Sequence, residues 1–482
     1  MRVVVVGGGP GGLATAKLLG SAGHEVVVVE RDDTPMPASA DEAFEWDRRG
    51  APQVRHSHAL LARLHNLLRD EHPDVLDALL AEGASAMRFG ENLPPEMEFT
   101  PEPGDEDLTM IACRRTTFEW VLRRSAMEQG AVTLRTGVGV AGLLATGGED
   151  PSGRPRVVGV RLEDGSELGA DLVVAANGRR GAIPAWLAEI GAGDVPETLE
   201  DTGIVYLSRF YRLRPGHDRP PASGTIGGDL GYIKYGTFYG DNRTFSITLA
   251  VPSDDDELRQ TLRNPAVFDA AARHLAATAP WLDGRSEPIT PDVHVMAGLL
   301  NKFVDLLPDG ELVATGFVGV GDAVVCTNPL YGRGCSTAFW SASLLAAAVA
   351  EHPDDIEAVA RAYETALRAE ILPWYHASVE QDREARRVAA ALLAGEDPYP
   401  DPSDPRVFAR SVLRDGLLPA LRVDAVVLRA FLRNFNLLTP PDALLRDTEV
   451  STRVLDVLQK KQERPPEPPL GPTTRAEFLA AL

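Results

Sequence analysis

The start of the chain constrains its fold more than any other feature. It contains a buried-strand pattern, a glycine loop and a second buried-strand pattern. Residues 2–6, Arg-Val-Val-Val-Val, are typical of a strand that is buried on both faces in a parallel sheet. Residues 11–22 have the spacing of a helix, and residues 25–30, Glu-Val-Val-Val-Val-Glu, repeat the strand pattern. The chain is therefore predicted to begin with a βαβ unit.

The loop between the first strand and the helix is Gly7-Gly8-Gly9-Pro10-Gly11-Gly12, a G-x-G-x-x-G sequence. Glycines in this place allow a tight turn, close approach of the backbone to a pyrophosphate, and close packing of helix on strand. Glu30 ends the second strand, where a carboxylate can accept hydrogen bonds from the ribose hydroxyls of an adenosine. These features together predict a dinucleotide site made by Gly7, Gly9, Pro10, Gly11, Gly12, Glu30 and Arg31.

Length and charge exclude several classes of function. The 482 residues are too many for one ordinary core, which predicts one very large α/β domain or two interleaved ones. The chain has 48 Lys+Arg against 70 Asp+Glu and a net charge of −22, so its field repels nucleic acid and anionic lipid. We therefore expect no nucleic-acid partner.

Cysteine usage and hydropathy bear on the compartment. The three cysteines lack metal-ligand or redox spacing, so we expect a reducing cytoplasm and no metal site. No stretch reaches the roughly 18 uninterrupted apolar residues that a membrane-spanning helix needs, so no integral membrane association is expected.

Segments rich in aromatic residues between about 195 and 300 predict an antiparallel sheet. A hairpin turn is expected at residues 240–243. Pairing across this turn would put Tyr235, Thr237, Tyr239, Ser246 and Thr248 on one face, and Phe238, Phe245, Ile247 and Leu249 on the other. The mixed hydroxyl and aromatic face suggests a substrate pocket formed by Tyr235, Thr237 and Tyr239, and a solvated sheet face is the alternative.

A second motif lies at residues 311–340. A strand that ends in Gly321-Asp322-Ala323 puts the Asp322 carboxylate where it can hold the hydroxyls of a ribityl chain. The loop Pro329-Leu330-Tyr331-Gly332-Arg333-Gly334 then opens a long helix, whose N-terminal amides can face the electron-rich edge of a flavin. This pair of features favours FAD over NAD as the dinucleotide.

The combination resembles the flavoprotein monooxygenases of the para-hydroxybenzoate hydroxylase type, also called class A. In that family a GDA-x(n)-P-x-x-G-x-G segment closes the FAD site, and the resemblance covers most of the first 350 residues. It implies that FAD is also bound by Asp322, Pro329, Gly332, Arg333 and Gly334.

Three further stretches support the resemblance. Arg115 begins a helix similar to the family's R-x-x-L-x-x-x-L helix, which contacts FAD; Phe118 replaces the first Leu, and Arg114 is the alternative register. Val138 follows a short strand and matches a position that binds adenine through its backbone.

The third stretch, GAPQVRHSHAL at residues 50–60, looks like the GVPQxRHxH segment of the branch that contains bacterial polyether epoxidases. The likeness implies that Arg55 contacts the flavin or a phosphate. His56 and His58 beside it are interpreted first as structural hydrogen-bonding residues, with covalent attachment of the flavin as a remote alternative.

One segment departs from the family pattern. The third motif, an Asp-Gly pair linked to both FAD and the nicotinamide cofactor, is replaced here by residues 171–180, in which Ala175 and Asn177 stand where acidic or hydroxyl residues are expected. FAD binding should survive this change, whereas NAD(P)H recognition has less support.

The resemblance implies a cytoplasmic FAD-dependent monooxygenase of secondary metabolism. NADH or NADPH would act as a transient reductant, O₂ would add at the flavin C4a, and the hydroperoxide would hydroxylate or epoxidise a small organic substrate. No side chain is indicated as a catalytic acid or base. Two alternatives keep the flavin: a geranylgeranyl-reductase-like enzyme acting on an isoprenoid-like substrate, and a flavin-binding protein without turnover. Halogenation is disfavoured because no lysine lies between Lys17 and Lys234.

The expected fold class is α/β, with a Rossmann-like FAD-binding domain of the glutathione-reductase type interleaved with an antiparallel-sheet substrate domain and a helical C-terminal region. The FAD-binding parts are expected at 1–194, with a helical insertion at about 57–110, and at 301–352. The substrate sheet is expected at 195–300 and the helices at 353–482. Thr474 and Glu477 form a predicted capping box for a short last helix. The sequence does not indicate an oligomeric state.

Overall fold

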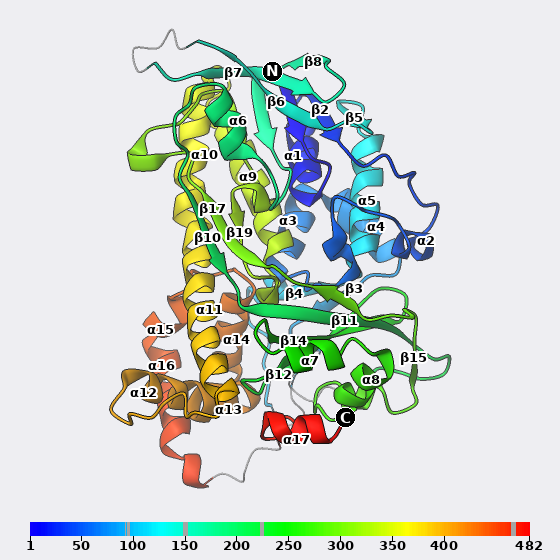
Figure 1. The fold of residues 1–482 in the computed structure, drawn as a ribbon, viewed down its shortest axis with the longest axis vertical. Coiled ribbons are helices and arrows are strands. Elements are labelled where there is room, and N and C mark those ends of the chain that lie inside the picture. Colours follow the sequence, from blue (N-terminus) through cyan, green and yellow to red (C-terminus); the bar gives the residue numbers. More distant parts are fainter. Residues whose placement is uncertain (92, 94–96, 148–152, 222–225, 464–468) are drawn as a thin grey trace.

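A five-stranded parallel sheet forms one end of the protein in the computed structural model, which describes residues 1–482 except 92, 94–96, 148–152, 222–225 and 464–468 (Figure 1). The strand order is β18-β9-β1-β2-β5. The strands are β1 (Arg2–Val6), β2 (Glu25–Glu30), β5 (Val132–Thr136), β9 (Leu172–Ala175) and β18 (Phe317–Gly319). Val3, Val4 and Val5 of the central strand are completely buried, as the continuous β-branched pattern predicts.

Three helices pack side by side against this sheet: α1 (Pro10–Ser21), α5 (Arg115–Glu128) and α9 (Gly334–Glu351). The first connects β1 to β2, so the predicted βαβ unit is confirmed. A small antiparallel sheet packs against β9 and consists of β6 (Val140–Thr146), β7 (Arg156–Leu162) and β8 (Glu167–Gly169). This arrangement confirms the expected α/β class.

A helical insertion separates β2 from α5. It contains α2 (Ala40–Phe44), η1 (Pro52–Arg55), α3 (Ala62–Glu71), α4 (Pro73–Ala81), β3 (Ser85–Arg88), η2 (Asp105–Asp107) and β4 (Thr109–Ala112). After β9 the chain forms α6 (Ile183–Glu189) and enters a three-stranded sheet of β10 (Glu197–Asp201), β17 (Leu300–Val304) and β19 (Val325–Cys326). This narrow sheet leads from the parallel sheet to the second large sheet (Figure 1).

The second large sheet is antiparallel, as expected, in the order β12-β13-β14-β11-β15, with β16 also paired to β11. Its strands are β11 (Ile204–Leu213), β12 (Gly227–Asp229), β13 (Lys234–Tyr239), β14 (Thr244–Pro252), β15 (Ser286–Pro288) and β16 (His294–Met296). One face packs on α7 (Asp256–Thr261), η3 (Ala279–Trp281), α8 (Pro265–Arg273) and α17 (Arg475–Ala480), and buries Phe268 and Phe478. The Thr474 and Glu477 capping box of α17 is present.

The β13–β14 hairpin differs from the sequence expectation by one residue. Tyr239 pairs with Phe245, and Gly240 N donates to Thr244 O, so three residues (241–243) form the turn instead of four. Asn242 and Arg243 have positive φ, 51° and 62°. Because side chains alternate along a strand, this difference exchanges the two faces of β13 relative to β14.

The sequence-based assignment of faces is therefore wrong. The predicted pocket residues Tyr235, Thr237 and Tyr239 share a face with Leu249, Ile247 and Phe245, their partners in the register. Phe238 and Gly236 share the opposite face with Ser246 and Thr248.

The C-terminal part is helical and lies along one side of the molecule (Figure 1). It comprises α10 (Ile356–Glu370), α11 (Leu372–Leu393), α12 (Pro405–Ser411), the π-helical turn η7 (Val412–Leu417), α13 (Leu418–Val423), α14 (Ala425–Phe435), α15 (Ala443–Arg446) and α16 (Thr448–Gln459). Helix α14 packs on the insertion. Arg429 of this helix donates to Asp105, and Oδ1 of Asn436, the residue after the helix, accepts from Ala62 N at 2.8 Å.

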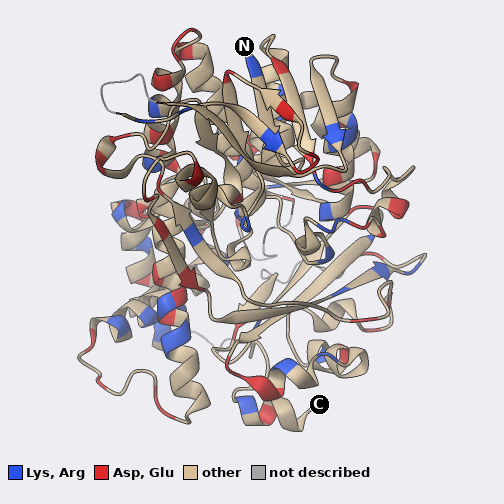
Figure 2. Cartoon of the chain, turned by 45° about the horizontal axis from the view of Figure 1, so that its top comes forward, with Lys and Arg blue, Asp and Glu red and all other residues tan. Residues whose placement is uncertain are grey.

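Charged residues of both signs are interspersed over the helices and loops (Figure 2). None of the helices in the described part of the chain is long and apolar enough to cross a membrane. Within the same residues, no group of three or more His, Cys, Asp or Glu side chains is arranged to hold a metal ion.

Candidate functional site

The glycine loop lies between β1 and α1 at the carboxyl edge of the parallel sheet. A Cβ on Gly12 would lie 2.0 Å from Gly7 O, and one on Gly7, whose φ is +112°, would lie 2.5 Å from Ala176 O. A Cβ on Gly9, in contrast, would meet no atom of the described protein within 4 Å. Gly7 and Gly12 thus serve packing, whereas Gly9 borders open space at the start of α1, where an anion is favoured.

Glu30 closes one side of this loop. Its Oε2 accepts from Gly8 N at 2.8 Å, and its Oε1 accepts from Asp32 N at 2.9 Å. The predicted acidic residue therefore does lie beside the glycine loop. Arg31, the next residue, is exposed. Val138 is 9% exposed and follows β5, which pairs with β2, so it lies along the same edge as Glu30.

A buried arginine that the sequence analysis missed lies next to Glu30. Arg48 is 5% exposed, stacks on the Trp46 ring at 4.7 Å, and has its Nη1 3.3 Å from Glu119 Oε2. Its Nε and Nη1 have no hydrogen-bond partner among the described residues. No sequence pattern distinguishes Arg48 from its neighbour Arg49, which is exposed and pairs with Asp47.

Arg115 lies in a buried cluster near Asp322, another of the residues predicted to bind FAD. The buried Arg115 donates from Nε to Glu119 Oε1 at 2.8 Å and from Nη1 to Cys335 Sγ. Burial raises the pKa of Asp322, and the positive charges of Arg115, Arg179 and Lys302 partly oppose this rise. Asp322 therefore lies close to the start of α5.

Arg55 occupies a different environment. Its Nη1 lies 3.3 Å from Glu45 Oε2, and its side chain is 27% exposed. The buried arginine contributed by this part of the insertion is Arg48 and not Arg55.

The loop that precedes α9 is ordered by local contacts. Asn328 Oδ1 accepts from Leu330 N, Pro329 begins the short helix η6 (Pro329–Tyr331), and Gly334 begins α9. Gly332 has φ +66°, and a Cβ there would lie 2.9 Å from the Ala59 Cβ. The predicted cofactor ligand Arg333 extends toward α11, where its Nη1 donates to Ser378 Oγ at 2.7 Å.

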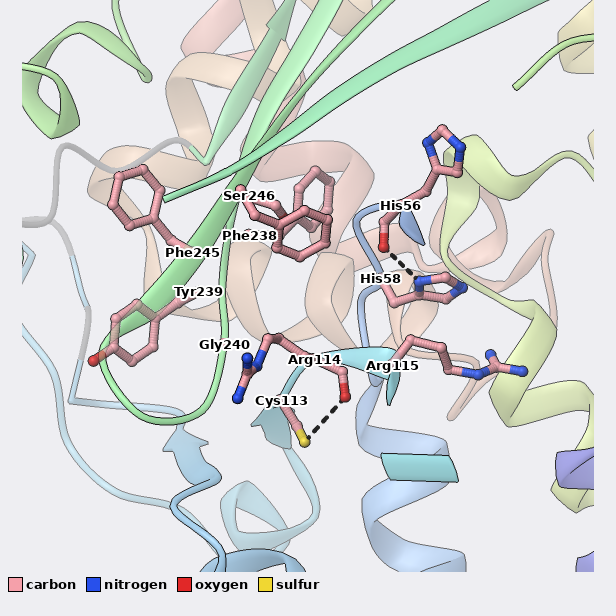
Figure 3. Close-up of a pocket in the computed structure, with 11 residues that line it drawn as sticks. His56, His58, Cys113, Arg114, Arg115, Phe238, Tyr239, Gly240, Phe245 and Ser246 are labelled. Carbon is pink, nitrogen blue, oxygen red and sulfur yellow. Dashed lines mark hydrogen bonds between the residues drawn. The ribbon is translucent and has the colours of Figure 1, made fainter. Parts of the chain in front are cut away.

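A pocket lies between the start of α5 and the β13–β14 hairpin (Figure 3). Its lining residues are His56, His58, Cys113, Arg114, Arg115, Phe210, Phe238, Tyr239, Gly240, Phe245 and Ser246. Because Arg115 belongs both to this wall and to the cluster with Asp322, the pocket adjoins the site formed by the glycine loop and α9. These residues are distant in sequence, so no local pattern could have identified the pocket.

Two of the three predicted pocket residues have other partners. Tyr235 OH donates to Leu470 O at 2.6 Å, and Thr237 Oγ1 donates to Ala277 O at 3.3 Å. Tyr239 does line the pocket, but its ring lies on the Phe245 side of the hairpin, away from His58 (Figure 3). Phe238 and Ser246, which share the other face of the hairpin, also line the pocket.

A chain of hydroxyl groups connects Ser246 with the buried His56, both of which line the pocket. Ser57 Oγ donates to Ser246 Oγ, and Thr248 Oγ1 donates to Ser57 Oγ, both at 2.7 Å. Ser208 Oγ lies 2.7 Å from Thr248 Oγ1 and 3.0 Å from His56 Nδ1. We call Ser246, Ser57, Thr248, Ser208 and His56 the hydroxyl chain.

Both histidines of residues 50–60 are uncharged at neutral pH. Burial, together with the nearby His294, His58 and Arg179, lowers the pKa of His56 to about 3. Burial and the charge of Arg115 lower the pKa of His58 to about 3. His58 Nδ1 donates to His56 O at 2.9 Å, because a carbonyl oxygen can only accept. The structural hydrogen-bonding role expected for these histidines is thus present.

Comparison with known proteins identifies the cofactor. Residues 1–190 match the family model for the FAD binding domain. The protein is an FAD-dependent oxidoreductase. It is 28% identical over 367 residues to Protein Rv3254 of Mycobacterium tuberculosis, covering 69% of each chain. It is 25% identical over 389 residues to the FAD-dependent monooxygenase asL6 of Sarocladium schorii, covering 76% of this chain and 84% of that one.

Solved structures share the fold of this FAD-dependent oxidoreductase. Pseudomonas aeruginosa PqsL, solved in complex with 2-aminobenzoylacetate, superimposes with a TM-score of 0.57 at 19% identity over 81% of this chain and 96% of PqsL. The flavin-dependent brominase Bmp2 superimposes with a TM-score of 0.57 at 16% identity over 96% of this chain and 100% of Bmp2. The fold alone therefore does not choose between oxygenation and halogenation.

The residues of the site fit FAD. The open space at Gly9 suits an anionic pyrophosphate, and so do Nε and Nη1 of Arg48, which make ion pairs with Asp32 and Glu119 but no hydrogen bond with the described residues. Glu30 and Asp322 are carboxylates, which suit the hydroxyls of ribose and ribityl groups.

Proposed function

We propose that the protein is a monooxygenase, which uses NADH or NADPH and O₂ to hydroxylate or epoxidise a small organic substrate, a specialised metabolite. The observation that carries this proposal is the aromatic pocket beside Arg115, which adjoins the FAD site. The similarity to asL6, an FAD-dependent monooxygenase, supports it.

FAD, when bound and reduced, would supply the activation of O₂. The amides at the start of α1 and the Arg48 guanidinium would bind its phosphates, and Glu30 would bind the adenosine ribose. Asp322 would bind the ribityl hydroxyls, and the first amides of α9, at Gly334, would face the pyrimidine edge.

The pocket would exclude water and orient the substrate. Phe210 and Phe238 offer apolar walls to a ring or an alkene, and Ser246 offers one hydroxyl near them. His56 and His58 bring no positive charge at neutral pH, since burial keeps both pKa values at about 3. These features favour a substrate with an apolar, unsaturated body and a single polar group.

The hydroxyl chain favours hydroxylation over epoxidation. Hydroxylation of a phenol or an enol is assisted when the substrate hydroxyl loses its proton, whereas epoxidation of an alkene involves no such proton. Thr248 and Ser57 donate along the chain toward Ser246, so the Ser246 hydroxyl could donate to the substrate oxygen and stabilise its deprotonated form. We therefore place hydroxylation first.

An oxygen-labelling experiment tests the proposal. The protein loaded with FAD would be mixed with NADH or NADPH and a panel of phenols, enols and alkenes under ¹⁸O₂, and the products analysed by mass spectrometry. One ¹⁸O atom in the product is the expected result. A product that forms equally well without O₂ would support the reductase alternative. No reduction of bound FAD by either nucleotide, with any of these compounds, would support a binding protein without turnover.

A further inference from the structure

Helix α11 contacts the loop that precedes α9, although α11 lies outside the residues that match the FAD-binding family model. Trp374, Ser378 and Asp382 follow one another at intervals of four residues, so they lie on one face of the helix. All three are buried, and all three contact residues 328–333 of the loop. One helix face therefore follows the loop over two turns.

The upper part of this contact holds Arg333. Its guanidinium lies over the rings of Tyr331 and Trp374, with Cζ 4.6 and 4.7 Å from their centroids. Its Nη1 donates to Ser378 Oγ at 2.7 Å and lies 3.4 Å from Trp374 O. Arg333 thus ties the end of the loop to α11.

The lower part of the contact is centred on Asp382, which is 2% exposed. Its Oδ1 accepts from Tyr331 OH at 2.9 Å and from Asn328 Nδ2 at 2.8 Å. Its Oδ2 accepts from Asn301 Nδ2, in β17, at 2.7 Å. One buried carboxylate therefore receives three hydrogen bonds, two of them from the loop.

The same network reaches the second large sheet. Asn328 N donates to Asn301 Oδ1 at 2.8 Å, and Asn328 Oδ1 accepts from Tyr206 OH, in β11, at 3.1 Å. Asn328 Oδ1 also accepts from Leu330 N at 3.0 Å, which shapes the turn into α9. Asp382 therefore binds Asn328, the loop residue that α11, β11 and β17 all contact.

We propose that Asp382 is a positioning residue of the FAD site. By binding Asn328 and Tyr331 it holds the loop in the conformation that presents the start of α9 to the flavin. The inference rests on the proposed function in one respect, namely that this loop contacts FAD. It assigns to the C-terminal helical region a part in retaining the cofactor.

The physical reason is preorganisation. A loop that is already held in its binding conformation loses little conformational entropy when the cofactor binds, so the bound state is favoured. Without the Asp382 carboxylate, the side-chain donors of Asn301, Asn328 and Tyr331 would each lose their hydrogen-bond acceptor. The loop would then relax, and FAD would leave faster.

Two variants and a control on the same helix test the proposal. Asp382→Leu removes all three hydrogen bonds, and Tyr331→Phe removes one of them. Glu380→Gln changes an exposed carboxylate two residues away. FAD dissociation would be followed by the gain of flavin fluorescence on dilution, and the surroundings of the bound flavin by visible circular dichroism.

We expect FAD to dissociate at least about tenfold faster from Asp382→Leu and about fivefold faster from Tyr331→Phe, from the usual strength of such hydrogen bonds. The visible circular dichroism should change in both variants and stay as in the wild type in Glu380→Gln. A purely structural role would lower the melting temperature of the protein and leave the spectrum of the bound flavin unchanged, which would overturn the proposal. If Asp382→Leu does not fold, a wild-type rate of FAD dissociation from Tyr331→Phe would likewise overturn the proposal.

This result can be separated from the fate of the proposed function. Faster FAD release from the variants, together with no ¹⁸O in any product of the wild type, would support the positioning role and contradict monooxygenation. Labelled product from the wild type, together with wild-type FAD release from both variants, would overturn the positioning role alone.

Discussion

The carboxylate of Asp241, at the tip of the β13–β14 hairpin, caps the helix that begins beside Arg114. Asp241 Oδ1 accepts from Arg114 N at 2.7 Å, and its Oδ2 accepts from Arg114 Nη2 at 2.6 Å and from Thr117 Oγ1 at 3.0 Å. Asp241 is completely buried and Arg114 is 4% exposed. A residue of the second sheet therefore stabilises the N-terminus of α5, where Arg115 adjoins the FAD site.

Breaking this pair should destabilise the protein strongly. Asp241→Asn leaves the buried Arg114 guanidinium with only the exposed Asp41 carboxylate, 3.6 Å away, so the free energy of unfolding should fall by about 3 kcal/mol. The double variant Arg114→Met with Asp241→Asn removes both charges and should recover much of that loss. Urea unfolding followed by tryptophan fluorescence measures both. An Asp241→Asn protein as stable as Glu449→Gln, in which only an exposed pair is broken, would contradict the prediction.

Two alanine substitutions in the glycine loop should separate folding from cofactor binding. The methyl group of Gly12→Ala would collide with Gly7 O, which should cost about 1–3 kcal/mol of stability. Gly9 has φ −83° and open space at its Cβ position, so Gly9→Ala should leave the stability of the FAD-free protein unchanged. The same methyl group occupies the space that suits the pyrophosphate, so FAD affinity should fall. Thermal melts without FAD measure the stability of both variants, and fluorescence titrations measure their FAD affinity. If Gly9→Ala binds FAD as tightly as the wild type, the pyrophosphate does not lie beside Gly9.

Substitutions of the neighbouring Arg48 and Arg49 provide a test of the FAD site and its matched control. Arg48→Met removes the buried guanidinium, whose Nε and Nη1 make no hydrogen bond with the described residues, and its loss should weaken FAD binding at least about tenfold, as for a charge-assisted hydrogen bond. Arg49→Met changes an exposed side chain that pairs with Asp47, so FAD affinity should stay as in the wild type. Isothermal titration of the FAD-free proteins gives both values. Equal affinities for the two variants would remove Arg48 from the cofactor site.

Stability should decrease in mild acid because of His56. Burial lowers its pKa from 6.5 to about 3 in the folded protein, so between these values the unfolded chain binds a proton that the folded protein does not. Acidification from about pH 6.5 toward 3 then costs about 1.4 kcal/mol per pH unit for this histidine. His56→Asn should show a shallower loss of stability than the wild type over this range. Replacement of the exposed His217 by Asn should keep the wild-type slope.

The hydroxyl chain predicts a pH-dependent defect in Ser246→Ala. This variant removes the Ser246 end of the chain, so turnover of a phenolic or enolic substrate should fall, most clearly below the pKa of the substrate hydroxyl. Turnover of an alkene should be unaffected. Thr237→Val, on the opposite face of the hairpin, should leave the pH profile of kcat unchanged. A phenol hydroxylation rate that is insensitive to Ser246→Ala at every pH would exclude the chain from the reaction.

Local patterns in the sequence predicted the elements that depend on neighbouring residues. The valine runs at 2–6 and 25–30 predicted strands that are buried on both faces, and Gly7 to Gly12 predicted the loop between them. The capping box of Thr474 and Glu477 is complete in the structure. In each case the residues that interact are a few positions apart, so the pattern itself contains the interaction.

The hairpin shows where local reasoning fails. A turn of three or of four residues fits the same letters Gly-Asp-Asn-Arg, and the choice exchanges the faces of Tyr235, Thr237 and Tyr239. The burial of Asp241 against Arg114, 127 positions away, accompanies the shorter turn. The hairpin sequence alone therefore does not predict that contact.

The sequence by itself thus determined the fold class and the glycine loop between the first two strands, because these follow from periodicity and short-range spacing. Only the tertiary structure decided which of Arg48 and Arg49 is buried, which face of the hairpin lines the pocket, and which helix holds the loop before α9. Burial and contact between segments far apart in the chain depend on how the two large sheets and the C-terminal helices pack together, and that packing has no signature in any single stretch of residues.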